Sequence, residues 1–331
     1  MGHSRCKKLA MKKILLLLSI FYFSFFIYAC SAFIATSNSI GGSISSLFKS
    51  PRKIPNRITE PYRSDARLSV LWVGHATTLI QIDDKMILTD PVFTTTVGQF
   101  SKRLVEPGID PKNLPDLDAV IISHMHIEHL SPASLDMFET KIQNLLIPQG
   151  GLVYIPNYDF GINELRTWQS WENDGLKITA VPVSHNGWRY GIDVAWMETS
   201  YTGYIIEYHD IKVYFGGDTG YDSTYFHETG KRFPGIDLAL LPIAPIHPRE
   251  YSWERHTDPG AAIQISRELG AKRLMPMHFD TFPESLDTLG EASATLQAEM
   301  EKNNFNSDQV VILDIGEQKV FIYRKEEKKV L

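Results

Sequence analysis

Cysteine is nearly absent from this chain of 331 residues. The only two, Cys6 and Cys30, both precede residue 31. The rest of the chain therefore has no disulfide bond and no thiolate ligand for a metal. Internal repeats and low-complexity tracts are also missing, which excludes a repeat architecture. A metal site beyond residue 30 must be built from histidine and carboxylate side chains.

Positive charge is scarce as well. The chain carries 33 Lys and Arg against 39 Asp and Glu, a net charge of −6. Five of the basic residues and none of the acidic ones lie within residues 1–29, so the remainder has a net charge of −11. Nucleic-acid binding requires a basic surface. We therefore predict no nucleic-acid partner for what is otherwise an ordinary folded composition.

Long apolar runs are missing except for one near the amino terminus. Residues 14–29 are almost wholly apolar and directly follow Lys12 and Lys13. A basic start, an apolar centre and small residues near the end are typical of a secretory signal, here residues 1–29. The closing Ile-Tyr-Ala-Cys resembles a bacterial lipobox, which would make Cys30 the lipidated first residue of a mature lipoprotein.

A second interpretation of this run stays open. The apolar stretch continues to Ala35, so it would also suit an uncleaved spanning helix of about 20 residues. Either anchor predicts a membrane-attached, extracytoplasmic protein, because the positive residues stay inside. Residues 30–67 are rich in Ser, Gly, Pro and Arg and are predicted to be a tether. Residues 68–325 would form the folded domain and 326–331 a short tail.

The densest group of metal-ligand side chains follows residues 119–122, an apolar run that predicts a short buried strand. His124, His126, Glu128 and His129 lie within six residues of one another, on the loop that this strand leads into. The first two histidines are close enough in sequence to hold one ion, and the adjacent Glu128 and His129 can turn towards a second. Neutral imidazoles together with a carboxylate suit zinc or a similar divalent metal.

Four further polar residues also follow predicted strands. They are Asp90 after 86–89, His185 after 177–181, Asp218 after 213–215 and His278 after 273–277. Loops at strand ends are places where a rigid scaffold can hold side chains in a defined arrangement. We therefore expect these residues to meet the histidine cluster.

The remaining patterns predict more strands and three helices. Strands are expected at 68–73 and at 144–147, 204–208, 238–241, 310–313 and 320–323, and a further strand after 68–73 is expected to end at Ile82. Helices are expected after the Ser131 cap, from Pro259 to Leu269, and from Leu286 with Leu289, Ala292, Leu296 and Met300 on the buried face. This order favours an α+β fold, a four-layer α/β/β/α sandwich.

Together these residues resemble the metallo-β-lactamase superfamily, whose signature is HxHxDH followed by a distant His, an Asp and a last His. The similarity covers nearly all of residues 68–325. Within that superfamily, several segments are most similar to N-acylphosphatidylethanolamine-hydrolysing phospholipase D. These segments are 72–77, 88–93, 215–221, 230–233, 256–259 and 278–282.

The resemblance implies two divalent ions, with zinc expected. It assigns His124, His126 and His185 to the first ion, and Glu128, His129 and His278 to the second, with Asp218 bridging both. The family has Asp where this chain has Glu128. The added methylene moves the carboxylate by about 1.5 Å, so the loop must adjust for Glu128 to bind.

Three more residues are given supporting or catalytic roles. The resemblance places His256 near the phosphate, where it would stabilise negative charge or protonate the leaving alkoxide and act with Asp218 in catalysis. Asp90 is expected to orient a ligand histidine, with a turn cap at Pro91 as the alternative. His75 matches a family position, and packing beneath the site explains it equally well.

The function implied is hydrolysis of a phosphodiester in N-acylphosphatidylethanolamine-like membrane lipids, by a hydroxide that bridges the two ions. The same fold would also serve a lactone or ester hydrolase. A third interpretation is a surface lipoprotein that binds metal without catalysis, with the change at Glu128 marking the loss. An apolar groove wide enough for acyl chains would favour the lipid phosphodiesterase, and a small polar pocket would favour the lactone or ester hydrolase.

Overall fold

The computed structural model describes residues 42–325, apart from 56, 99–100, 250–252 and 284. The predicted signal segment, Cys30 and the tail 326–331 lie outside the described residues. Within the described part, no helix is long and apolar enough to cross a membrane.

The first of two large sheets has seven strands in the order β15-β1-β2-β3-β6-β7-β8. Their bounds are β1 Ala66–Gly74, β2 Thr77–Ile82, β3 Lys85–Thr89, β6 Ala119–Ile121, β7 Asn144–Pro148, β8 Gly161–Leu165 and β15 Gln318–Tyr323. β15, β1, β2 and β3 pair antiparallel, whereas β3, β6, β7 and β8 run parallel. The parallel strands therefore bring the ends of β3 and β6 to one edge.

The second sheet has six strands in the order β14-β13-β12-β11-β10-β9. Their bounds are β9 Ser170–Asn173, β10 Leu176–Val181, β11 Gly203–Tyr208, β12 Ile211–Phe215, β13 Leu238–Pro242 and β14 Leu274–Met277. β12, β13 and β14 are parallel. A small hairpin of β4 (Thr96–Val97) and β5 (Ser101–Lys102) lies apart from both large sheets.

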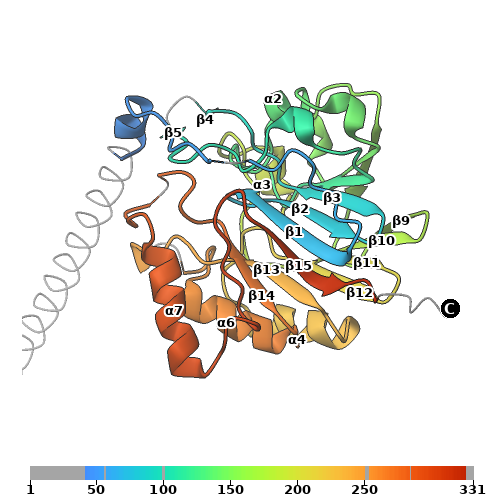
Figure 1. Cartoon of the computed structure of the whole chain (residues 1–331). Helices are drawn as coiled ribbons and strands as arrows, with labels where there is room; N and C mark the ends of the chain where they lie inside the picture. The colour runs from blue at the N-terminus through green and yellow to red at the C-terminus, as the bar shows by residue number, and fades with distance from the viewer. Residues whose placement is uncertain (1–41, 56, 99–100, 250–252, 284, 326–331) are drawn as a thin grey trace, which may run out of the picture.

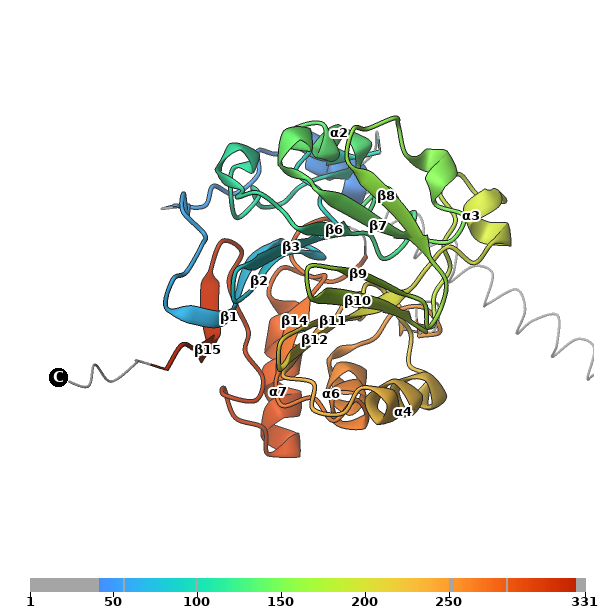
Figure 2. The same ribbon diagram turned by 90° about the vertical axis from the view of Figure 1, so that its right-hand side faces the viewer.

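Helices cover the outer faces of the two sheets (Figures 1 and 2). α4 (Ser223–Arg232), α6 (Pro259–Glu268) and α7 (Glu291–Asn303) lie against the second sheet, and α2 (Pro132–Leu135) lies over the first. The described part of the chain also contains one more short α-helix, α3 (Val194–Met197). Its 3-10 helices include η1 (Pro111–Asn113), η2 (Glu139–Lys141) and η3 (Leu152–Tyr154). The predicted α/β/β/α sandwich is confirmed.

The alternation of side chains along β1 explains why residues 70–73 are all apolar. Leu68, Val70 and Trp72 enter the core cluster that also holds the second sheet. Leu71 and Val73 point to the opposite side and join the cluster under α2. Because side chains alternate between the faces of a strand, a strand covered on both faces needs apolar residues at every position.

Helix capping follows the predicted pattern in two places. The Ser131 side chain accepts a hydrogen bond from Ser134 N at the start of α2. The Asp258 side chain accepts one from Ala261 N at the start of α6, where Pro259 takes the first turn. A polar acceptor before a proline in the first turn satisfies one of the free helix N–H groups.

Two of the predicted elements were wrong in extent. The last helix begins at Glu291 and not at Leu286, because Gly290 in front of it has a left-handed backbone, with φ 84°. Leu289 is consequently 62% exposed, while Ala292 and Leu296 are buried as predicted. Residues 310–313 form no strand; there, Val310 makes a single bridge to Leu274 of β14.

The described part of the predicted tether lies against the domain. Residues 42–47 form a helix, drawn in blue in Figure 1. Ser43 Oγ donates to the Pro283 carbonyl at 3.0 Å, and Ser46 Oγ accepts from Lys102 N at 2.9 Å. Further along, Arg52 forms a bridge with Val105. These contacts attach residues 43–52 to the domain, while the predicted tether and the domain boundaries stay predictions.

Candidate metal centre

The candidate site lies where strands of both sheets end. Asp90 N donates to the Ile121 carbonyl at 2.9 Å, which joins the loop after β3 to the end of β6. The histidine loop follows β6, and Leu130 N closes a turn on the His126 carbonyl at 2.9 Å. This turn brings His126 and His129 to the same side of the loop. Residues from the ends of β10, β12 and β14 complete the site.

The three histidines assigned to the first ion lie together. His124 Nε2 is 2.9 Å from His126 Nδ1, and the His185 ring is 4.5 Å from that of His124 between centroids. One ring nitrogen from each of the three lies within 4.8 Å of the others. His185 Nδ1 is hydrogen bonded to the Arg255 carbonyl at 2.9 Å, so its Nε2 faces the cluster.

The protonation of these rings suits metal binding. Burial lowers the pKa of His124 and of His185 well below 6.5. Burial also lowers the pKa of His126. All three imidazoles are therefore neutral at neutral pH, and a neutral imidazole is the form that binds a metal.

The Asp218 carboxylate lies between the two predicted ligand sets. Its Oδ1 is 3.0 Å from His278 Nε2, and its Oδ2 is 3.4 Å from His129 Nε2. The same Oδ2 is 3.9 Å from His185 Nε2. Burial would raise the pKa of Asp218, but the imidazoles of His278 and His129 outweigh it and hold that pKa well below 3.8. An ionised carboxylate in this position is suited to bridge two cations.

Asp90 contacts His129, one of the predicted ligand histidines. Asp90 Oδ2 lies 2.7 Å from His129 Nδ1, and both side chains are fully buried. The same carboxylate accepts hydrogen bonds from Ser123 N and Ser123 Oγ, each at 2.6 Å. With Nδ1 engaged in this way, His129 Nε2 is directed towards Asp218.

Glu128 lies near residues of both predicted ligand sets. Its Oε1 lies 3.5 Å from His126 Nδ1. It also groups with His124 and His129, with one ligand atom from each residue within 4.8 Å of the others. The longer side chain thus lies near His124 and His126 of the first ligand set and near His129 of the second. The assignment of Glu128 to an ion stays a prediction.

His75 lies closer to the centre than a packing residue would. Its ring centroid is 3.8 Å from that of His278 and 5.0 Å from that of His129. One ring nitrogen from each of these three residues lies within 4.8 Å of the others. His75 N donates to Thr281 Oγ1 at 2.6 Å, which connects the loop after β1 to the loop after β14. The sequence singled out His75 but did not indicate this contact with two ligand histidines.

His256 joins the site from the loop before α6. Its Nδ1 lies 3.5 Å from Asp218 Oδ2, and its side chain is 22% exposed. The next residue anchors the loop, because Thr257 Oγ1 donates to the Pro242 carbonyl at 2.7 Å. Burial lowers the pKa of His256 to about 4. Its imidazole is therefore neutral at neutral pH and acts as a hydrogen-bond donor or acceptor, not as a cation.

The donor atoms fit divalent cations. His185 Nε2, His256 Nδ1 and both Asp218 oxygens are buried, and none of them meets hydrogen-bond geometry with a described partner. Burying unsatisfied polar atoms is costly, and cations among them would satisfy several at once. Imidazole and carboxylate ligands suit zinc and similar first-row divalent metals.

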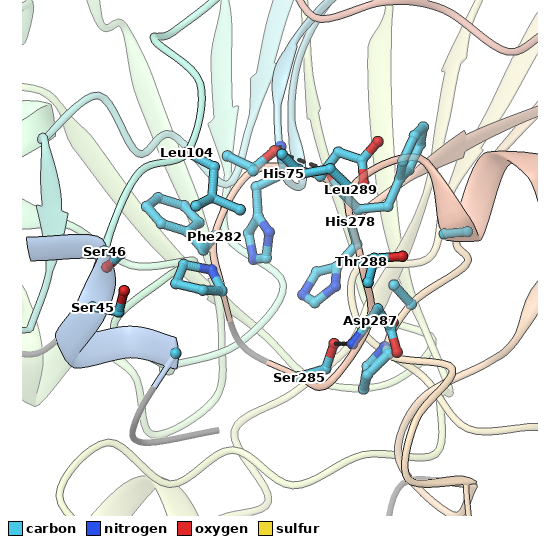
Figure 3. Close-up of a pocket in the computed structure, with 18 of the residues that line it drawn as sticks. Ser45, Ser46, His75, Leu104, His278, Phe282, Ser285, Asp287, Thr288 and Leu289 are labelled. Carbon is cyan, nitrogen blue, oxygen red and sulfur yellow. Dashed lines mark hydrogen bonds between the residues drawn. The ribbon is translucent and has the colours of Figure 1, made fainter. Parts of the chain in front are cut away.

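Two cavities flank the cluster. The first, which we call the cleft, has a volume of about 370 Å³ and is lined by His126, Glu128, His256 and His278, by Asn186 and Arg255, and by the apolar Val97, Ile127, Trp188 and Pro245. The second has a volume of about 230 Å³ and is lined in part by His75, His278, Leu104 and Phe282. Figure 3 shows His75 and His278 on one side of this second cavity and Ser45 and Ser46 of the helix 42–47 across from them.

Comparison with known proteins agrees with the fold. Residues 85–279 match the family described as a beta-lactamase superfamily domain. The chain belongs to the metallo-β-lactamase superfamily. It shares 28% identity over 252 residues with the N-acyl-phosphatidylethanolamine-hydrolyzing phospholipase D 1 of Caenorhabditis elegans, covering 70% of this chain and 68% of the relative.

Two further similarities extend the comparison. The mitochondrial N-acyl-phosphatidylethanolamine-hydrolyzing phospholipase D of Saccharomyces cerevisiae is 27% identical over 281 residues, which is 81% of this chain and 59% of that protein. The structure of Igni18, a metallo hydrolase from Ignicoccus hospitalis, aligns with a TM-score of 0.57 and 21% identity over 76% of this chain and 97% of that one. The structural likeness shows the fold, and the superfamily match makes the chain a metal-dependent hydrolase.

Proposed function

We propose that this superfamily member is a phosphodiesterase of phospholipase D type that acts on N-acylphosphatidylethanolamine-like lipids. The observation that carries the proposal is the position of His256, which lines the cleft beside the candidate metal ligands and lies 3.5 Å from Asp218. The names of the two similar phospholipases support the same substrate class. His124, His126 and His185, and His129 and His278 with Glu128, would hold two ions bridged by Asp218, with zinc the metal expected.

The ions, when bound, would supply a hydrolytic nucleophile at neutral pH and stabilise charge on the phosphoryl oxygens. The chain contributes the rest. Asp90 holds the ring of His129 in one orientation. The neutral imidazole of His256 donates a hydrogen bond to a phosphoryl or leaving oxygen on the open side of the cleft. Arg255 also lines the cleft, and its guanidinium complements an anionic phosphodiester.

The cleft combines a polar floor with apolar walls. His126, His256 and His278 provide the polar side, and Ile127 and Trp188 contribute apolar surface. A cavity of about 370 Å³ is at the lower end of the range for small-molecule sites. Its size suits a lipid headgroup with the first part of a chain, and the apolar walls favour this substrate over a small polar one.

Product analysis tests the proposal directly. The full chain is incubated with vesicles that contain N-acylphosphatidylethanolamine, and the products are identified by mass. We expect phosphatidic acid and an N-acyl ethanolamine, with turnover lost in His126→Ala and kept in His227→Ala, whose side chain is 64% exposed on α4. Opening of a lactone without lipid turnover would favour the lactone hydrolase. Absence of both metal and turnover would favour a binding protein.

We also propose that the apolar segment before the domain anchors it to the outer side of a membrane, through lipidated Cys30 or an uncleaved helix. The basic residues at 5–13 and the apolar run at 14–29 support this location. Metabolic labelling with a radioactive fatty acid distinguishes the two anchors. Label that is incorporated by the wild type and lost in Cys30→Ser indicates the lipoprotein, and an unlabelled membrane protein of full length indicates the helix.

A further inference from the structure

Exposed apolar side chains lie on one side of the cleft, on the segment 42–53 that leads into the domain. Ser43 of the helix 42–47 lines the cleft. Ile44 beside it is 46% exposed, and Phe48 just after the helix is 86% exposed. We call Ile44 and Phe48 the first rim.

A second group of exposed apolar side chains lies on the other side of the cleft. Trp188 lines the cleft, and its ring centroid is 4.7 Å from that of His126. In the following residues and in α3, Tyr190 is 76% exposed, Ile192 85%, Trp196 51% and Met197 63%. We call these residues, 188–197, the second rim. Figure 2 shows α3 on the outside of the molecule.

The helix 42–47 turns only part of its apolar surface to the domain. Leu47 is half-buried, and the hydrogen bonds to the domain come from serines: Ser43 Oγ donates to the Pro283 carbonyl, and Ser46, which is 3% exposed, accepts from Lys102 N. Its neighbours Ile44 and Phe48 face outward. A surface helix normally packs its apolar side against the core. Apolar side chains gathered outward on both sides of a cleft indicate that an apolar partner covers them.

We propose that the two rims dock on a phospholipid bilayer, so that the cleft opens towards the membrane. This inference deepens the proposed function and rests on it, because a lipid substrate is what makes the bilayer the expected partner. Trp and Tyr, which occur in the second rim, are the residues enriched at membrane interfaces. In this arrangement the acyl chains stay in the bilayer while the headgroup enters the cleft.

Charge near the first rim supports a bilayer as the occupant. Lys49, Arg52 and Lys53 follow Phe48 closely, and all three are exposed. The chain as a whole has a net charge of −6, so this basic group stands out from its surroundings. Basic residues next to apolar ones attract anionic lipid headgroups and then allow the apolar side chains to insert.

The length of the chain between the proposed anchor and the domain also suits this docking. Twelve residues, 30–41, separate the predicted signal from the first described residue. Fully extended, they reach about 40 Å. An anchor at Cys30 would therefore hold the first rim near the membrane, and an anchor that extends to Ala35 would hold it nearer still.

Site-specific photo-crosslinking tests the docking without requiring turnover. The photoreactive residue p-benzoylphenylalanine replaces Phe48, Tyr190 or, as the control, Tyr323, in the full chain reconstituted in vesicles of phosphatidylethanolamine and phosphatidylglycerol. Tyr323 is 61% exposed and pairs with Ala66, at the end of β1 away from His75. We expect lipid adducts at positions 48 and 190 at least tenfold above those at 323. Crosslinks to a second copy of the chain, or equal labelling at 323, would overturn the proposal.

Paired substitutions test the consequence for the reaction. Ile44→Ser with Phe48→Ser, and separately Trp196→Ser with Met197→Ser, are expected to reduce turnover of vesicle lipid at least tenfold. Turnover of the soluble phosphodiester bis(p-nitrophenyl) phosphate should stay unchanged, which excludes misfolding. An unchanged rate on vesicles in both pairs would contradict docking. Lipid adducts in a protein that hydrolyses no phosphodiester would instead refute the proposed function and leave the docking surface in place.

Discussion

Asp90 Oδ2 lies 2.7 Å from His129 Nδ1, with neither side chain exposed to solvent. The Asp90 carboxylate also accepts hydrogen bonds from Ser123 N and Ser123 Oγ, each at 2.6 Å. The His129 ring consequently has one orientation, and its Nε2 is held 3.4 Å from Asp218. We therefore propose Asp90 as a positioning residue that acts on the candidate metal centre through His129.

Asp90→Asn should weaken metal binding about 10-fold to 100-fold, the usual effect of losing such a partner. The amide NH₂ would face one of the donors of Ser123 or His129, so the ring would lose its orientation. Titration with a competing chelator measures the affinity. Asp118→Asn is the control, because Asp118 accepts from Met86 N at 2.8 Å at the far end of the same strands. Equal affinities in the two variants would contradict this role for Asp90.

Glu128→Gln should lower the bound metal from two ions per chain towards one, because the amide is a poorer ligand than the carboxylate. Glu128→Asp restores the residue of the family signature and should keep both ions. Metal content after gel filtration gives the answer. If Glu128→Gln keeps two ions as tightly as the wild type, Glu128 is not a ligand, and its position 3.5 Å from His126 Nδ1 has another purpose.

His256→Gln should lower kcat by about 10²-fold to 10³-fold, the usual effect of removing one donor to a developing oxyanion. The metal content should stay unchanged, because the residue acts on the substrate. The matched control is His247→Gln. His247 lies in the same segment between β13 and α6, its side chain is 54% exposed, and it pairs with Glu291. A normal kcat in His256→Gln would remove His256 from the reaction, and a parallel loss of metal would make it a ligand.

The ion-free protein should lose stability as the pH falls from about 6.5 towards 4. Burial lowers the pKa of His124 and His185 well below 6.5 and that of His256 to about 4. In the unfolded chain each titrates near 6.5, so in this window the unfolded chain binds more protons and acid favours it. The pKa of His129 is instead raised well above 6.5 by the Asp218 and Asp90 carboxylates despite burial, so this ring is already protonated in the folded chain above the window and contributes a nearly constant stability within it.

Thermal melts in chelator across this pH range measure the effect. His256→Gln should make the decline shallower, since a shift of one pKa unit corresponds to about 1.4 kcal/mol. A melting temperature that is constant or rises on acidification would contradict the assignment of neutral buried imidazoles.

The residues of the candidate site were predictable because short local sequence patterns mark them. His124, His126 and His129 follow an apolar strand at short spacing, and Asp218 and His278 each follow another. The ends of strands in two packed sheets lie together at one edge. Because each of these residues directly follows a strand in the sequence, we could expect their side chains to lie close to one another. The same local rules predicted the caps of α2 and α6.

Three other features have no local sequence pattern and were not predictable. The contact between His75 and His278 joins residues about 200 positions apart, and no local pattern encodes a ring distance of 3.8 Å. β9 is largely exposed, with only Trp171 half-buried, so it has no apolar alternation to reveal it. The sequence predicts a tether over residues 42–47 because this stretch is rich in serine. In the structure it is a helix, and its serines are hydrogen bonded to Pro283 and Lys102.

The central claim is that side chains from separate strand ends hold two divalent ions bridged by Asp218. Metal content per chain, measured by mass spectrometry on the full-length protein and on Asp218→Asn, tests it most directly. We predict two ions per chain in the wild type and one or fewer in Asp218→Asn, with the fold retained by circular dichroism. A wild type without metal, or two ions held equally well in Asp218→Asn, would contradict the account.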